Sequence, residues 1–268
     1  AVLGGLLPLL ARGSGDGALV RPVLAAAGLS RVSTTAAALL VVPVGPARGS
    51  GVAALRAGVR AVPAVVRDTT VLVSRDRQLR RVLAVSALVG TTLAALELFG
   101  PLQVAALTGS RTEGSAAFGV VMAVSFAAAG VGALLAPAVR RAARGSAGVG
   151  SAVLALLAAL AIAAVPLGGP LVLGCLFAVF YVADAAAWPL WKSVLHGRVA
   201  SGQRATALSA SSLALMAGAL LGSLVLPRLA GAGTTVGFLA ATGAMLVVAA
   251  VSLGLRERVD RAAATPGT

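Results

Sequence analysis

The sequence has few charged, aromatic, cysteine or histidine residues, and these scarcities exclude several classes of protein. Charged residues make up 11% of the 268-residue chain, against roughly 25% in an ordinary soluble domain, so polar side chains are too few to cover a soluble surface. Cys175 is the single cysteine, which excludes an intrachain disulfide and a cysteine metal cluster. With one histidine as well, the chain is expected to bind no metal and no other cofactor.

Hydrophobic residues supply 59% of the chain, and its mean hydropathy is +0.98. This composition predicts an all-α, polytopic membrane bundle, because a helix satisfies its own backbone hydrogen bonds within lipid. A net charge of +14 would suggest a nucleic-acid partner for a soluble domain. Here the basic residues form short clusters between apolar stretches, without aromatic residues for base stacking. We therefore expect the lipid bilayer as a partner, and no nucleic acid.

Six apolar stretches are long enough to cross a bilayer, which takes about 20 residues as a helix. They cover residues 82–107, 115–139, 149–167, 171–191, 205–227 and 233–255. The uncharged stretch 145–183 is too long for one crossing, and Pro166-Leu-Gly-Gly-Pro170 within it predicts a turn. Residues 82–255 are therefore predicted to form a six-helix transmembrane unit.

The flanking segments differ from this unit. Residues 1–46 contain a partial apolar helix and one weak span, in which Arg31 is either a counter-charge inside the bundle or the sign of a shorter span. Residues 47–81 are predicted to be a basic linker with an amphipathic helix, and residues 256–268 a tail. The chain opens inside an apolar segment without an initiator Met, so we expect it to be N-terminally truncated.

The basic residues fall on one side of the predicted bundle. Alternating the spans places seventeen lysines and arginines on the side of residues 47–81, against Arg111 and Arg228 on the other side. Because positive charge accumulates in cytoplasmic loops, the linker and the C-terminus are predicted to be cytoplasmic in a multi-pass cell-membrane protein.

Three local motifs resemble those of a known family. They are Glu97-Leu-Phe-Gly-Pro101, then Gly132-Ala-Leu-Leu-Ala-Pro137 with the basic turn Arg140-Arg-Ala-Ala-Arg144-Gly145, and the stretch from Trp188-Pro-Leu-Trp-Lys192 to Arg204-Ala-Thr-Ala-Leu-Ser209. Together with the basic linker and the six spans, they resemble the major facilitator superfamily, in particular its bacterial drug and metabolite exporters. The resemblance implies the C-terminal six-helix half of that fold plus part of the N-terminal half, in a bacterial inner membrane.

The resemblance also implies a function. It suggests secondary active transport, namely proton-coupled export of small molecules by alternating access, and the sequence has no G-x-x-x-x-G-K-[ST] nucleotide loop. The alternatives are a permease subunit of an ATP-driven transporter, or a non-transporting fragment or half-transporter that needs the missing N-terminal helices or a partner chain. An enzyme is not expected, because the spans hold no nucleophile–base or metal constellation.

Glu97 and Asp184 are the acidic residues within the six spans. An intramembrane carboxylate is costly and therefore indicates function by default; the alternative is that each lies near an interface or hydrogen-bonds locally. We predict that one or both bind protons or substrate, because desolvation favours the protonated carboxyl group. Gln103, Tyr181 and Trp188 are candidate substrate contacts, or else interface anchors and core.

The spans divide into two three-helix units, 82–167 and 171–255. Glu97 and Asp184 lie in the first helix of their unit, and each is followed by a proline, which suits the inverted repeats of transporters.

Three further groups of residues also have a structural interpretation. Gly218 and Gly222 form a GxxxG pair that favours close helix packing. Arg140, Arg141 and Arg144 are interpreted as a topogenic cluster or a conformational gate. His196 has no metal-ligand partner at suitable spacing and is predicted to be solvated or interfacial.

Overall fold

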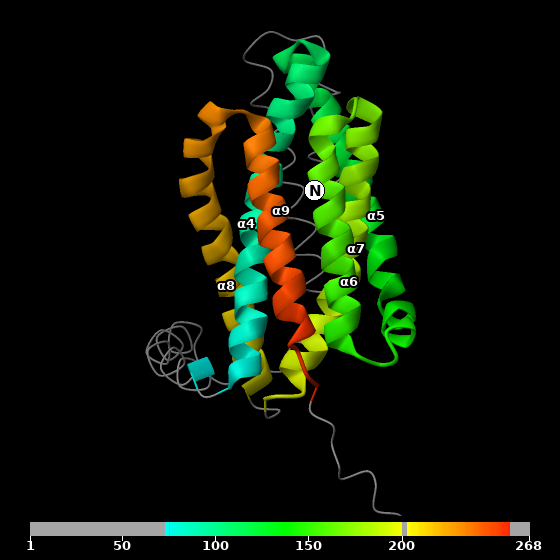
Figure 1. Ribbon diagram of the computed structural model, residues 1–268, viewed down its shortest axis with the longest axis vertical. Helices are drawn as coiled ribbons and strands as arrows, with labels where there is room; N and C mark the ends of the chain where they lie inside the picture. Colours follow the sequence, from blue (N-terminus) through cyan, green and yellow to red (C-terminus); the bar gives the residue numbers. More distant parts are fainter. Residues whose placement is uncertain (1–72, 75, 200–202, 258–268) are drawn as a thin grey trace, which may run out of the picture.

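The computed structural model describes residues 73–74, 76–199 and 203–257, and the regular elements in these ranges are all helical (Figure 1). They are α4 (Arg77–Thr108), α5 (Arg111–Ala142), α6 (Ala147–Ala164), the 3-10 helix η2 (Val165–Leu167), α7 (Pro170–His196), α8 (Arg204–Val225), the 3-10 helix η4 (Leu226–Ala232) and α9 (Thr234–Leu253). Six of these helices are long and apolar enough to span a membrane, which confirms the predicted all-α bundle. The predictions for residues 1–72 and for the tail beyond residue 257 lie outside the described residues.

Polar side chains fix where the first three long helices begin. The Asp76 carboxylate accepts a hydrogen bond from the backbone N–H of Gln78 at 2.7 Å, which satisfies a donor that the first helical turn leaves free. As a result, α4 begins at Arg77, five residues before the apolar span predicted from the sequence. Ser110 and Ser146 cap α5 and α6 in the same way.

The chain turns where glycine, proline and arginine interrupt the apolar stretches. The 3-10 helix η2 ends α6, and Pro170 occupies the first turn of α7, where its missing N–H costs nothing. The uncharged stretch is thus divided as predicted. At the other end of α6, Arg144 (φ 53°) and Gly145 (φ 82°) turn the chain from α5 into α6. Arg144 therefore adopts a left-handed conformation that is uncommon outside glycine.

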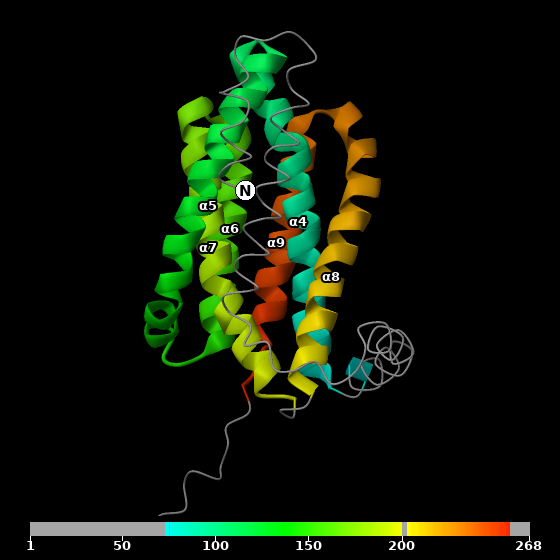
Figure 2. The same cartoon turned by 180° about the vertical axis from the view of Figure 1, so that it is seen from behind.

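The six long helices pack as two interlocked units, α4–α6 and α7–α9 (Figures 1 and 2). The most extensive contacts join α4 to α8 and α5 to α7, while α6 packs on α7 and α9, and α4 on α9. Exchanging the two units converts each of these contacts into another of the same set, as expected for an internal repeat. The equivalence is incomplete, because α4 contacts α5 more than α7 contacts α8. Since each unit has three helices, α4 begins at the end of the bundle where α7 ends.

Glycine permits the close contact between α4 and α8. A Cβ atom built on Gly218 would lie 1.9 Å from the carbonyl oxygen of Ala87, and one on Gly222 would lie 3.2 Å from Cα of Thr91. Thr91 Oγ1 also donates a hydrogen bond across this interface to the carbonyl of Gly218, at 3.0 Å. The two backbones approach each other because no side chain intervenes, as in membrane helix pairs that use small residues.

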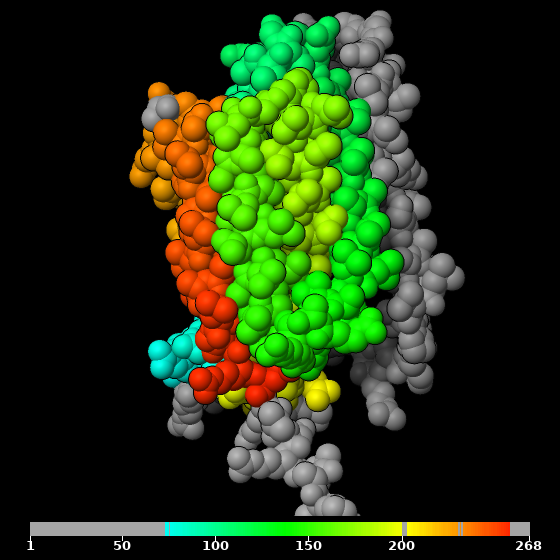
Figure 3. All heavy atoms as spheres, turned by 45° about the vertical axis from the view of Figure 1, so that its right-hand side comes forward, coloured from blue at the N-terminus to red at the C-terminus, as the bar shows by residue number. Residues whose placement is uncertain are grey.

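Basic residues gather at one end of the bundle. Among the described residues, ten lysines and arginines lie at the end where α4 begins and α9 ends, whereas Arg111 and Arg228 lie at the opposite end. The segment that follows α9 links the ends of α5 and α7 at this basic end. Glu257 in that segment accepts hydrogen bonds from Arg140 and from Ser193 Oγ, both at 2.6 Å. Figure 3 shows the red end of the described chain against the green end of α5.

Candidate functional site

A cavity of about 270 Å³ lies between α4, α5 and α7. Its lining residues are Leu93 and Glu97 from α4, Phe126 and Ala129 from α5, and Tyr181, Asp184, Ala185 and Trp188 from α7. Glu97 and Asp184 each lie more than ten residues from both ends of their helices, or roughly 15 Å along the axis. The cavity therefore holds two carboxyl groups within the apolar part of the bundle.

The two carboxyl groups have different surroundings. Asp184 is buried, and its Oδ2 accepts a hydrogen bond from Trp188 Nε1 at 3.1 Å. Its other oxygen, Oδ1, is buried and has no hydrogen-bond partner among the described residues. Glu97 is exposed and lines the cavity from α4. Because a buried acceptor without a partner is costly, Oδ1 of Asp184 is available to a proton or to a positively charged group.

Aromatic rings form much of the remaining wall. Phe126, Tyr181 and Trp188 line the cavity, in a chain that has only nine aromatic residues. The rings of Phe126 and Tyr181 lie 5.2 Å apart and are tilted by 59°, so α5 and α7 contact each other through aromatic side chains at this point. Aromatic faces attract cations, most strongly where water is excluded. Carboxylates and rings together give the cavity the chemistry of a cation site.

Lys192 adds a positive charge beside this cavity, one helical turn beyond Trp188. Its Nζ lies 4.9 Å from the centroid of the Trp188 ring and donates a hydrogen bond to Ser211 Oγ of α8 at 3.1 Å. Ser211 Oγ is in turn 2.9 Å from Ser86 Oγ of α4. Sequence reasoning missed Lys192, although its spacing of four from Trp188 and eight from Asp184 places all three on one slowly turning face of α7.

Four of the five candidate contacts come together in the cavity, and Gln103 does not. Glu97, Asp184, Tyr181 and Trp188 all line it. Gln103 is buried farther along α4, where its Oε1 accepts a hydrogen bond from Thr234 Oγ1 at the start of α9. In this structure Gln103 therefore joins α4 to α9 instead of facing the two carboxyl groups.

The arginine cluster and His196 lie at the basic end, away from the cavity. Arg140 and Arg141 line a shallow depression at the end of α5, and Arg140 also pairs with Glu257. Arg144 is exposed in the turn that follows. His196 ends α7, and its buried Nδ1 has no hydrogen-bond partner in the described ranges. Within those ranges no three histidine, cysteine or acidic residues are grouped to hold a metal ion.

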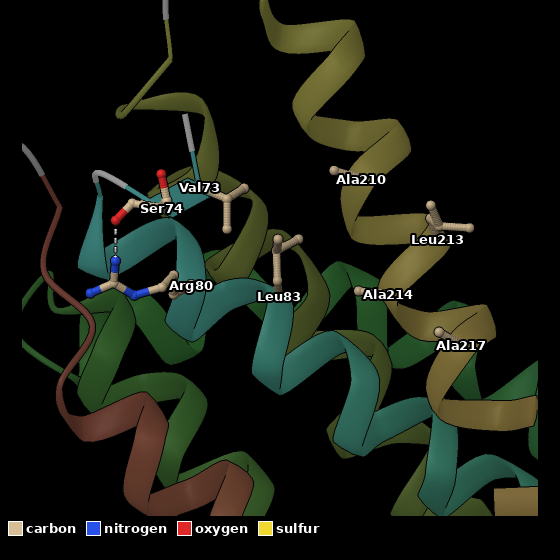
Figure 4. A pocket seen from close by; sticks show the side chains of 8 residues that line it. All are labelled: Val73, Ser74, Arg80, Leu83, Ala210, Leu213, Ala214 and Ala217. Carbon is tan, nitrogen blue, oxygen red and sulfur yellow. Dashed lines mark hydrogen bonds between the residues drawn. The ribbon is translucent and has the colours of Figure 1, made fainter. Parts of the chain in front are cut away.

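A second hollow, between the start of α4 and α8, differs in chemistry (Figure 4). Its lining residues are Val73, Ser74, Arg80, Leu83, Ala210, Leu213, Ala214 and Ala217. The Arg80 guanidinium is turned toward Ser74, to whose carbonyl it donates a hydrogen bond. Small and apolar side chains of α8 make the opposite wall. None of its described lining residues is acidic, so these residues do not supply the cation-binding chemistry of the cavity around Asp184.

Comparison with known proteins adds no assignment to this geometry. No protein-family model, curated protein or solved structure matches the chain.

Proposed function

We propose that the chain is part of a secondary active transporter of the major facilitator type, which exports organic cations in exchange for protons across a bacterial inner membrane. The observation that carries the proposal is the cavity of about 270 Å³, in which two carboxyl groups face three aromatic rings inside a six-helix bundle. Its volume of about 270 Å³ lies just below the range for small-molecule pockets, roughly 300–1,000 Å³, which favours a small substrate. The basic end of the bundle would then face the cytoplasm, following the excess of positive charge.

The chemistry of the walls supports a cationic substrate. A carboxylate in an apolar bundle needs a proton or a counter-charge, and Asp184 Oδ1 has neither among the described residues. An organic cation satisfies the carboxylate by charge and the faces of Phe126, Tyr181 and Trp188 by cation–π attraction. An anionic substrate would instead place like charges together and leave Asp184 unpaired.

The same carboxyl groups account for proton coupling. Either a proton or an organic cation neutralises a carboxylate in the cavity, and the two compete for it. Release of the cation on one side and uptake of a proton in its place keep the site neutral while access alternates. The repeated arrangement of α4–α6 and α7–α9 supports this mechanism, because inverted repeats allow a central site to open to either side in turn.

Binding and exchange of a cation test the proposal. The full chain is purified, and binding of tetraphenylphosphonium is followed by quenching of tryptophan fluorescence; uptake into proteoliposomes is then measured with an imposed pH gradient. Asp184→Asn and Glu97→Gln are expected to weaken binding at least about tenfold, since each removes a charge that the cation requires. Glu113→Gln is the matched control, because Glu113 is an exposed acidic residue in the first turn of α5.

The outcomes separate substrate recognition from coupling. Binding that is lost in both cavity variants and kept in Glu113→Gln supports a cation site. Wild-type affinity in Asp184→Asn and Glu97→Gln would overturn it. Uptake that follows the pH gradient in wild-type vesicles supports exchange, whereas uptake that is indifferent to the gradient would refute proton coupling.

A further inference from the structure

Lys192 carries a half-buried charge that the proposed exchange does not use. It lies in α7 one turn beyond Trp188 and two turns beyond Asp184, and its ammonium group stands over the Trp188 ring at 4.9 Å. The indole N–H of the same ring donates a hydrogen bond to Asp184 Oδ2 at 3.1 Å. Trp188 therefore separates a positive charge from a negative one along a single helix face.

A directed chain of hydrogen bonds holds the ammonium group in this position. Ser86 Oγ donates to the carbonyl of Val82 at 3.0 Å, so its hydroxyl accepts the proton of Ser211 Oγ, 2.9 Å away. Ser211 Oγ is then left as an acceptor for Lys192 Nζ at 3.1 Å. The hydroxyls of Ser86 and Ser211 each donate their one proton within this series of hydrogen bonds. Residues of α4, α7 and α8 thus hold the ammonium group of Lys192 in place.

We infer that Lys192 sets the net charge of the cavity, so that the site accepts one positive charge at a time; this inference rests on the proposed function. When both carboxyl groups that line the cavity are ionised, Lys192 neutralises one of the two negative charges from outside the cavity wall. A monovalent organic cation then completes the balance. A divalent cation would bring an excess positive charge into an apolar bundle, which is unfavourable.

The size of the effect follows from the spacing. Eight residues of helix separate Asp184 from Lys192, or about 12 Å. At an effective dielectric constant of about 20, a unit charge at this distance alters the affinity for a monovalent cation about tenfold, and for a divalent cation about a hundredfold. The ratio of the two affinities thus depends on Lys192 by a factor of about ten.

The experiment compares a monovalent and a divalent organic cation on the same protein. Tetraphenylphosphonium and methyl viologen are titrated against the full chain at fixed salt. Lys192→Met is expected to strengthen binding of both cations and to shift their affinity ratio about tenfold toward methyl viologen. Lys192→Gln, which keeps a donor for Ser211, is expected to give the same shift, so that a packing defect in one variant does not decide the result.

Two controls test whether the shift depends on the positive charge at position 192. Lys192→Arg keeps the positive charge and is expected to keep the wild-type ratio. Arg141→Met removes an exposed positive charge from the same end of the bundle and is also expected to leave the ratio unchanged. A wild-type ratio in both Lys192→Met and Lys192→Gln, with binding intact, would overturn the role of Lys192 alone. Wild-type protein that binds neither cation would overturn the proposed function and the inference together.

Discussion

Replacing Gly218 by alanine should force α4 and α8 apart. The added Cβ would lie 1.9 Å from the carbonyl oxygen of Ala87, about 1.1 Å closer than the shortest distance that real Cβ atoms show, and the obstructing atom belongs to the backbone. Overpacking of this kind costs about 1–3 kcal/mol. Loss of the hydrogen bond from Thr91 to the Gly218 carbonyl adds about 0.6 kcal/mol. The better helix propensity of alanine offsets about 1 kcal/mol of this cost, so we expect a net loss of about 0.6–2.6 kcal/mol.

The free energy of unfolding in mixed detergent micelles measures this loss. Gly130→Ala is the matched control, because Gly130 lies inside α5 and a Cβ built there meets no atom within 4 Å. This control is expected to be neutral or slightly stabilising. Gly90→Ala should behave like Gly218→Ala, since its Cβ would lie 2.0 Å from the carbonyl oxygen of Leu215. Equal stability of the Gly218 and Gly130 variants would refute the close packing of α4 on α8.

Three further substitutions probe the surroundings of the cavity. In Trp188→Phe, tetraphenylphosphonium should no longer quench tryptophan fluorescence, because the remaining Trp191 is buried against Ser252 and does not line the cavity; persistent quenching would place the cation elsewhere. Ser252→Ala leaves the Trp191 N–H without its acceptor at 3.3 Å and should lower the free energy of unfolding by about 1–3 kcal/mol; an unchanged value in the same micelle assay would contradict this. Glu257→Gln breaks a partly exposed ion pair, worth about 0–1 kcal/mol, so hydrogen exchange should quicken in residues 254–257 while global stability hardly changes. Exchange at the wild-type rate would show that the pair does not hold this segment.

Hydropathy alone was sufficient to predict the helices, since the lipid environment demands about 20 apolar residues per span. The division of the long uncharged stretch also follows from local chemistry, because Pro166 and Pro170 interrupt the backbone hydrogen bonding of a continuous helix. The start of α4 was harder to predict from the sequence. Asp76 caps a turn that is basic and not apolar, so a hydropathy window places the boundary five residues too late.

The site depends on contacts that a single helix does not encode. Glu97 and Asp184 were identifiable because charge inside a span is rare, but which side chains surround them depends on the rotation of each helix. Gln103 illustrates the limit: its partner, Thr234, is 131 residues away in sequence. Lys192 stands near the end of its span, where basic residues are common, and only its contacts with Trp188 and Ser211 distinguish it from an interfacial lysine.

The close helix packing and the cavity have a common origin in the pairing of the helices. α4 is held against α8 through Gly218, and α7 is held against α5 through Gly132, whose Cβ would lie 2.3 Å from the carbonyl oxygen of Val182. By contrast, α4 and α7 contact each other far less than either contacts its glycine-packed partner. Glu97 and Asp184 project from these two helices into the gap between the tightly packed pairs. A movement of α4 against α7 would therefore break fewer contacts than a separation of either helix from its glycine-packed partner, and the two carboxyl groups lie where α4 and α7 face each other.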